Sequence, residues 1–329
     1  MTLAVWRRVL TASCAAAAAG AVLAGCTQQP APDRPVPRLY PFDSAVYFTP
    51  QQSVLLQSAE ERAVQRCMRR HGFAYTPAPP SPVQEPRNPY GLLDERTART
   101  NGYGITAAAA RGAFASPAPS PPAGRSRDSA RSRRVLLGTE ARQRTISLPT
   151  GEQVTVRTDA CVTRAREMVY GPGWDDLFYL FQALSNEVIE RVEDDPAVTG
   201  AWRRWAACME KQGFAKPTRD DVLSSVERRV RRAAGRGESV RAAARAEIKT
   251  AVRDARCQEQ AGLRRHVEAA QHAAEQRRLG SYEDELSRLR SMRDHGLAQA
   301  SLPAKAPSDE SAEGSSKTTA EQSAADSRH

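Results

Sequence analysis

An eight-residue pattern occurs twice in this chain, and it constrains the fold more than any other feature. Cys67–Ala74 reads CMRRHGFA and Cys208–Ala215 reads CMEKQGFA, so the copies share Cys, Met, Gly, Phe and Ala. The spacing fits a Schellman helix end, in which a glycine takes the left-handed conformation and the next residue contacts the methionine. The repeat therefore predicts two helices that end alike, each with a cysteine in its last full turn. The expected end residues are Gly72 with Phe73 and Gly213 with Phe214.

The N-terminus carries an export signal. Arg7 and Arg8 precede an uncharged run, Val9–Leu23, of the kind that forms the apolar part of such signals. The run closes on Leu-Ala-Gly-Cys26, the pattern of a bacterial lipoprotein signal, in which the cysteine receives diacylglyceryl and palmitoyl chains. The alternatives are an ordinary secretory signal and an uncleaved membrane helix, which needs ~20 apolar residues. The two arginines leave the twin-arginine export route open as well as the general one.

Lipidation at Cys26 predicts where the protein is held. Each buried methylene contributes ~0.8 kcal/mol, so two or more acyl chains anchor a protein stably without a spanning helix. The Pro-rich segment after Cys26 predicts an extended, semi-rigid tether. We therefore expect a protein anchored by lipid to the extracytoplasmic face of the plasma membrane.

Four of the six cysteines remain once Cys14 leaves with the signal and Cys26 is lipidated. An even number outside the cytoplasm favours disulfides, and four cysteines allow three pairings. The duplication selects one pairing, because each Cys-Met motif is followed by one further cysteine with a similar lead-in, VRTDAC or VRDARC. The expected bridges are Cys67–Cys161 and Cys208–Cys257. If the helix before Cys257 is unbroken, this cysteine lies about 140° from Val252, and it then needs a second buried flank or a bend.

The sequence predicts neither a metal site nor an enzyme. Cys67 and His71 have ligand spacing on one helix face, but the second copy has Gln212 in place of the histidine, so we expect no metal and no cofactor. The chain lacks the Gly-x-Ser-x-Gly, His-Glu-x-x-His and phosphate-binding glycine motifs. Paired acids such as Asp175-Asp176 suit helix starts.

Apolar periodicity predicts a mostly α-helical fold, a helical bundle with a small β-hairpin and two disulfide-stapled repeat units. Alternating apolar residues around Thr150-Gly151 predict the hairpin. A strong helix ends before Asp195, which is expected to cap the next helix. A long helix is expected from Ser239 past Leu263, and Ser281 is expected to cap the last one.

The expected organisation follows from these elements and from composition. Residues 1–25 are the lipoprotein signal, 26–50 the tether, 51–173 the first Cys-paired unit with a disordered Pro/Ser/Arg insert at about 113–134, 174–300 the second unit, and 301–329 a disordered tail.

Positive charge suggests a class of partner. The net charge of +10 falls to +8 when Arg7 and Arg8 leave with the signal, and the segments 124–144 and 218–256 each carry an excess of +5. Export argues against nucleic acid and leaves lipid head groups and anionic wall polymers as polyanions. The bland alternative is a solvated, arginine-rich helix face. The candidate contact residues are Arg228, Arg229, Arg231 and Arg232.

The second repeat resembles a group of uncharacterised actinobacterial secreted proteins and lipoproteins. Their pattern is a helix opening on Asp-Pro, a Trp, Cys-Met-x-x-x-Gly-[Phe/Tyr], and an Ala/Val-rich helix reaching Asp-x-x-Cys. The residues that carry the match are Asp195, Pro196, Trp205, Cys208, Met209, Gly213, Phe214, Asp254 and Cys257. The resemblance implies an exported protein and no known activity.

These observations predict a non-catalytic envelope lipoprotein that binds or organises wall or membrane components. The alternative is an accessory subunit of a membrane complex, which would use the helical hairpin around Gly280. The sequence identifies no protein partner.

Overall fold

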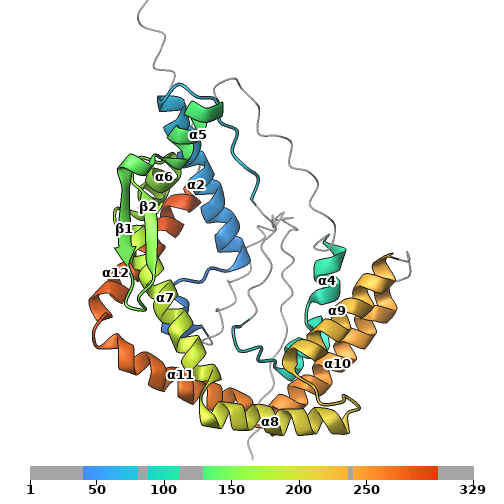
Figure 1. Ribbon diagram of the computed structural model, residues 1–329. Helices are drawn as coiled ribbons and strands as arrows, with labels where there is room; N and C mark the ends of the chain where they lie inside the picture. Colours follow the sequence, from blue (N-terminus) through green and yellow to red (C-terminus); the bar gives the residue numbers. More distant parts are fainter. Residues whose placement is uncertain (1–39, 81–87, 112–128, 236–239, 303–329) are drawn as a thin grey trace, which may run out of the picture. The chain divides into compact units, whose positions relative to one another are not determined.

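The structure is a computed structural model that describes residues 40–80, 88–111, 129–235 and 240–302 (Figure 1). The predicted fold class is confirmed, because the described chain is mostly α-helical with a two-stranded antiparallel hairpin and two disulfides. Cys26, most of the predicted tether and almost all of the predicted tail lie outside the described residues. Within them, no helix has both the length and the apolar character needed to cross a membrane.

The elements follow one another along the chain with short connections. The helices are α1 (Pro41–Ser44), α2 (Pro50–Arg70), α3 (Glu95–Asn101), α4 (Ile105–Ala110), α5 (Ser129–Leu137), α6 (Cys161–Tyr170), α7 (Trp174–Glu193), α8 (Pro196–Lys211), α9 (Arg219–Gly235), α10 (Val240–Gln260), α11 (Leu263–Leu279) and α12 (Glu283–Ser301). A 3₁₀ turn, η1 (Glu140–Arg142), leads into strands β1 (Gln143–Ser147) and β2 (Gln153–Arg157).

The hairpin forms where alternation predicted it. Gln143 pairs with Arg157 and Ser147 with Gln153 in the antiparallel register. Ile146 and Val156 are buried on the same face, against Ala183 of α7. The alternating apolar residues therefore attach a two-stranded sheet to a helix, which such a small sheet needs for stability.

The duplicated motif ends two helices in the same way. At the end of α2, Gly72 has φ +81°, and the N–H of Phe73 donates to the carbonyl of Met68 at 3.0 Å. At the end of α8, Gly213 has φ +93°, and the N–H of Phe214 donates to the carbonyl of Met209 at 3.2 Å. Each glycine N–H also donates to the carbonyl three residues before it. These are the two bonds of a Schellman ending.

Replacing Gly72 or Gly213 by alanine is expected to lower the free energy of unfolding by about 1–2 kcal/mol, because a left-handed backbone penalises a Cβ by that amount. An added Cβ would meet no atom within 4 Å at either site, so the penalty is conformational and not steric. Gly280 is the matched control, with φ −55° and equally open space. Gly280→Ala should stabilise by about 0.4–1 kcal/mol. Urea unfolding of the three variants measures this, and equal losses at all three glycines would contradict it.

Both predicted disulfides are present. Cys67 of α2 is bonded to Cys161, the first residue of α6, with a Cα–Cα distance of 5.6 Å. Cys208 of α8 is bonded to Cys257 of α10, also with a Cα–Cα distance of 5.6 Å. Each bridge thus joins the last full turn of a capped helix to a cysteine farther along the chain.

Helix α10 buries two flanks, which answers how Cys257 reaches α8. On one flank, Ala251 and Ala255 pack against Ala98 of α3. On the other, Cys257 packs in a cluster with Trp205 of α8. The expectation of a second buried flank is therefore correct, and no bend is required.

The two predicted repeat units share a hydrophobic core. The largest buried cluster combines Leu56 of α2 and Cys161 of α6 with Phe181 of α7 and Leu289 of α12. In the other direction, α3 and α4 of the first predicted unit pack on α10 and α9 of the second. The boundary between residues 173 and 174 therefore separates two copies of a pattern, while the cores interleave.

Three boundary predictions are wrong. The predicted tether at 26–50 contains buried residues near its end, because Phe42 packs edge-on against Phe181 with ring centroids 5.4 Å apart. The predicted disordered insert ends too late, since its last residues belong to α5. The long helix does not continue past Leu263, because Gly262 takes a left-handed φ of +65° and separates α10 from α11.

The capping predictions divide. Asp195 caps α8 as expected, accepting hydrogen bonds from the N–H groups of Ala197 at 2.8 Å and Val198 at 3.3 Å. Ser281 does not cap α12, whose N-cap residue is Tyr282 without a side-chain cap bond. The prediction at Ser281 failed because the chain makes a further turn there, in which the N–H of Tyr282 donates to the carbonyl of Leu279.

A buried carboxylate holds α10 to its neighbours. Asp254, 3 % exposed, accepts hydrogen bonds from Trp205 Nε1 at 2.8 Å, from the Tyr103 hydroxyl at 2.8 Å and from Gln258 Nε2 at 2.9 Å. Burial raises the pKa of Asp254, and these three hydrogen bonds partly oppose the rise. The Asp-x-x-Cys motif thus places a polar hub and a disulfide one turn apart on α10.

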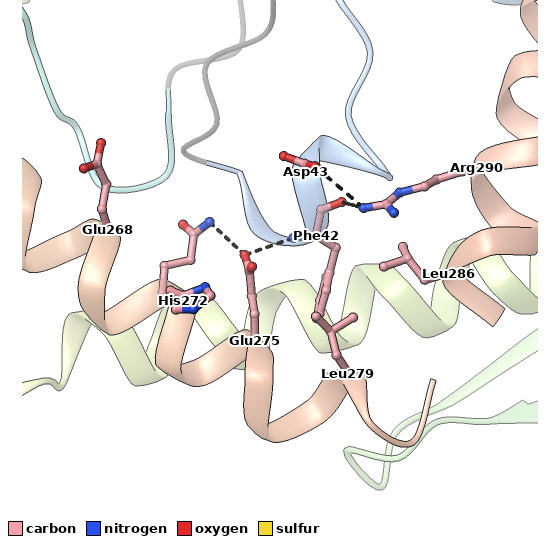
Figure 2. Close-up of a pocket in the computed structure, with 9 residues that line it drawn as sticks. Phe42, Asp43, Glu268, His272, Glu275, Leu279, Leu286 and Arg290 are labelled. Atoms are coloured by element: carbon pink, nitrogen blue, oxygen red, sulfur yellow. Dashed lines mark hydrogen bonds and ion pairs between the residues drawn. The ribbon is translucent and has the colours of Figure 1, made fainter. Parts of the chain in front are cut away.

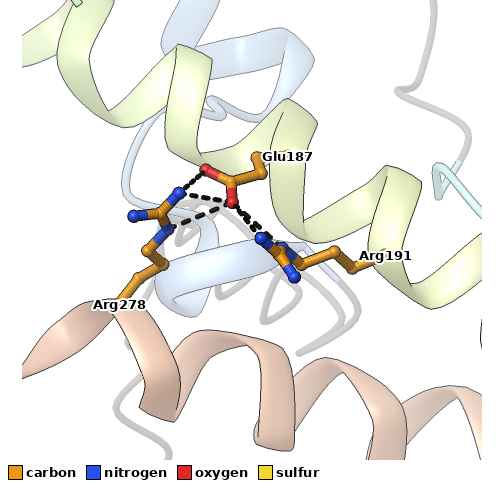
Figure 3. A network of polar contacts seen from close by, with 3 residues as sticks. All are labelled: Glu187, Arg191 and Arg278. Carbon is orange, nitrogen blue, oxygen red and sulfur yellow. Dashed lines mark hydrogen bonds and ion pairs between the residues drawn. The ribbon is translucent and has the colours of Figure 1, made fainter. Parts of the chain in front are cut away.

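An arginine–carboxylate network joins α7 to α11 (Figure 3). Arg278 of α11 donates to both oxygens of Glu187 at 2.5 and 2.6 Å, and Arg191 donates to the same carboxylate at 2.8 Å. Burial by itself would raise the pKa of Glu187, but hydrogen bonds from Arg278 and Arg191 lower it below its usual value. The pair therefore ties α11, which lines the pocket described below, to the core helix α7.

Candidate functional site

The four candidate arginines lie on the exposed face of α9. Arg228, Arg229, Arg231 and Arg232 are all exposed, whereas the opposite face of the helix is buried. The buried face packs through residues such as Val226 and Val230 against Ile105 of α4 and Ala243 of α10. The apolar stripe of α9 is thus used for folding, and the arginines are directed to solvent.

One of these arginines is paired. Arg231 forms an ion pair with Glu227, one turn earlier on α9, at 2.7 Å. Helix α10, which packs against α9, carries three further exposed cations, Arg241, Arg245 and Lys249. The surface is basic in composition, and an exposed ion pair such as Arg231–Glu227 contributes only about 0.3–0.5 kcal/mol.

Three residues with metal-ligating atoms meet at the first disulfide. Sγ of Cys67, Sγ of Cys161 and a ring nitrogen of His71 lie within 4.8 Å of one another. The two sulfur atoms are bonded to each other, so neither is a thiolate that can bind a metal ion. In this oxidised form the cluster is a structural bridge with a histidine beside it.

A pocket that the sequence did not predict lies between α1, α11 and α12 (Figure 2). Its volume is about 510 Å³, within the range of small-molecule sites. Acidic, basic and apolar side chains surround it together. The lining residues are Phe42, Asp43, Glu268, Gln271, His272, Glu275, Leu279, Leu286 and Arg290.

The wall formed by α1 has an unusual backbone. Phe42, Asp43 and Ser44 have φ angles of +55°, +57° and +63°, so three successive residues with side chains take the left-handed conformation. Each costs about 1–2 kcal/mol in isolation. Hydrogen bonds from the neighbouring helices hold the turn, because the Phe42 N–H donates to Glu275 at 3.0 Å and Arg290 donates to the Phe42 carbonyl at 3.4 Å.

Figure 2 shows how the two charged helices converge on this turn. Arg290 reaches from α12 toward Phe42 and Asp43, with 3.9 Å between its guanidinium and the Asp43 carboxylate. Glu275 reaches from α11 toward the same turn. Burial raises the pKa of Glu275, and hydrogen bonds from the Phe42 backbone and Gln271 partly offset the rise.

The sequence offered little warning of this pocket. Gln271 and Glu275 lie one turn apart on α11, but this spacing is common on helices that bind nothing. The other wall comes from a segment predicted to be tether, and it meets Glu275 across 233 positions of sequence. A site assembled from such distant segments has no local pattern.

Comparison with known proteins leaves the chain without an assigned relative. No family model matches it, and no curated protein and no solved structure matches it.

Proposed function

We propose that this protein is a non-catalytic envelope lipoprotein, anchored by acyl chains on Cys26 and positioned on the extracytoplasmic face of the plasma membrane. The anchor rests on the sequence pattern around Cys26. Two disulfides between buried or half-buried cysteines support an oxidising compartment, because such bonds persist outside the cytoplasm.

In this proposal the folded part contacts anionic wall polymers or lipid head groups through α9. The observation that carries it is the exposure of all four arginines, Arg228, Arg229, Arg231 and Arg232, on one helix face. Near an anionic surface each arginine contributes about 1 kcal/mol, which falls off over a Debye length. A tethered protein meets that surface at high local concentration, so weak contacts suffice.

Changing the four α9 arginines to glutamine is expected to weaken binding to purified wall material, or to vesicles containing anionic lipid, by about tenfold or more. Co-sedimentation of the mature chain without its lipid measures this. Wild-type binding should also fall as salt rises, because exposed charges are screened. The two surfaces, tested in parallel, identify which polyanion is preferred.

A charge-matched control separates local contact from net charge. Glutamine at Arg69, Arg70, Arg203 and Arg277, all exposed on other helices, removes the same charge. This control variant should bind like the wild type. Equal losses in both variants would reduce the effect to net charge, and absence of wild-type binding would remove the contact from the proposal.

The alternative function, an accessory subunit that binds through its C-terminal helices, receives less support. Leu286 and Leu289 of α12 belong to the protein's own core. Among the described residues, the exposed large apolar side chains are Val54, Leu137, Met168 and Leu302. Only Leu302 is near the C-terminal hairpin, so the described helices offer no apolar face there for a partner.

A further inference from the structure

Gln271 presents an unused acceptor in the pocket between α1, α11 and α12. Its side chain lines the pocket although the residue is only 7 % exposed. Its Nε2 donates to Oε1 of Glu275 at 2.8 Å, which fixes the orientation of the amide. Its Oε1 is buried and has no hydrogen-bond partner among the described residues. A buried acceptor without a donor costs about 1–3 kcal/mol, so this atom indicates a missing donor.

The charges of the pocket indicate what kind of donor fits. Asp43, Glu268 and Glu275 supply three carboxylates, against the guanidinium of Arg290. The hydrogen bonds from Phe42 and Gln271 both end on Oε1 of Glu275, and the described residues make none to its Oε2. A cation that donates hydrogen bonds satisfies both the amide oxygen and this carboxylate.

An organic cation fits these groups better than a metal ion. In the part of the chain that the structure describes, the one group of three metal-ligating residues with donor atoms within 4.8 Å of one another is at the Cys67–Cys161 disulfide. The carboxylates of the pocket are therefore too dispersed to converge on a single ion. The pocket also has an apolar side formed by Phe42, Leu279 and Leu286, which suits a hydrocarbon chain.

We propose that the pocket binds a small organic molecule with a primary ammonium group on a short apolar chain. The ammonium donates to Oε1 of Gln271 and to the carboxylate of Glu275, and the chain packs on Leu279 and Leu286. Glu268 at the exposed edge adds long-range attraction for the cation. The site is independent of the α9 arginines, so either proposal can fail without the other.

The test uses the mature chain and three probes of equal length: pentylammonium, 1-pentanol and pentanoate. Binding is followed by calorimetry up to millimolar concentration and by backbone NMR shifts. Pentylammonium is expected to bind at one site, with shifts clustered on α1, α11 and α12, and the other two probes are expected not to bind. Equal binding of pentanoate, shifts elsewhere in the protein, or no binding of pentylammonium would overturn the proposal.

Variants test the assigned atoms. Gln271→Met keeps the volume of the side chain but removes the acceptor, and should weaken pentylammonium binding by about tenfold or more. Glu268→Gln should weaken it several-fold and more strongly at low salt. Glu283→Gln on α12 removes the same charge from an exposed residue outside the pocket and should leave the affinity unchanged. Unchanged affinity in folded Gln271→Met, or equal losses in the Glu268 and Glu283 variants, would overturn the assignment.

Discussion

Replacing Cys67 and Cys161 together by alanine will lower the free energy of unfolding by about 4.7 kcal/mol. The bridge closes a loop with a sequence separation of 94, and its removal returns that loop-closure entropy to the unfolded chain. Stability of a domain is only about 5–15 kcal/mol, so this loss is a large part of the total. The melting temperature should fall by roughly 10–20 °C for a folded part of this size.

The second bridge supplies the comparison. Cys208 and Cys257 are separated by 49 positions, and their double alanine variant should lose about 4 kcal/mol. Guanidinium unfolding followed by circular dichroism measures both. Each variant should also show a steeper dependence on denaturant, because the uncrosslinked unfolded chain exposes more surface.

This slope separates the entropic effect from a simple packing defect. A cavity at Cys67 and Cys161, which are 1 % and 0 % exposed, would lower the transition midpoint without changing the slope. A loss below about 1 kcal/mol, or an unchanged slope, would mean that the unfolded chain is already compact without the bridge.

The features that the sequence predicted well are local or duplicated. The helix ends at Gly72 and Gly213 need only a handful of neighbouring residues, because the backbone of one turn decides them. The disulfide pairing needed long-range information, and the repeat supplied it by giving each Cys-Met motif its own second cysteine. The hairpin followed from alternation over two short strands.

The features that the sequence missed depend on tertiary contact. Phe42 follows a Pro-rich stretch and resembles the end of a linker until α7 and α11 cover it. Gly262 was available as a stop signal, but the apolar pattern continued on both sides and concealed the break. The pocket needs the turn at Phe42 and the carboxylate of Glu275 together, and no spacing rule connects positions so far apart.

Asp254→Ala is expected to lower the free energy of unfolding by about 3 kcal/mol or more. The substitution leaves three buried donors, on Trp205, Tyr103 and Gln258, without their shared acceptor, and each unsatisfied donor costs about 1–3 kcal/mol. Asp220→Ala is the matched control on an exposed carboxylate, whose side chain is 86 % exposed, and should change stability by less than about 0.5 kcal/mol. A loss at Asp254 no larger than that of the control would show that the hub contributes nothing.

The pH dependence identifies the carboxylate itself. Burial raises the pKa of Asp254 above its model value of 3.8, so the folded protein binds this proton more readily than the unfolded chain. The wild type therefore gains stability from this group as pH falls through the raised pKa toward 3.8. Asp254→Asn keeps an acceptor for Trp205 but has no proton to bind. The difference in unfolding free energy between the wild type and Asp254→Asn should consequently widen over that pH range. A difference that stays constant or narrows would mean that the carboxyl group is ionised in the folded protein across the whole range.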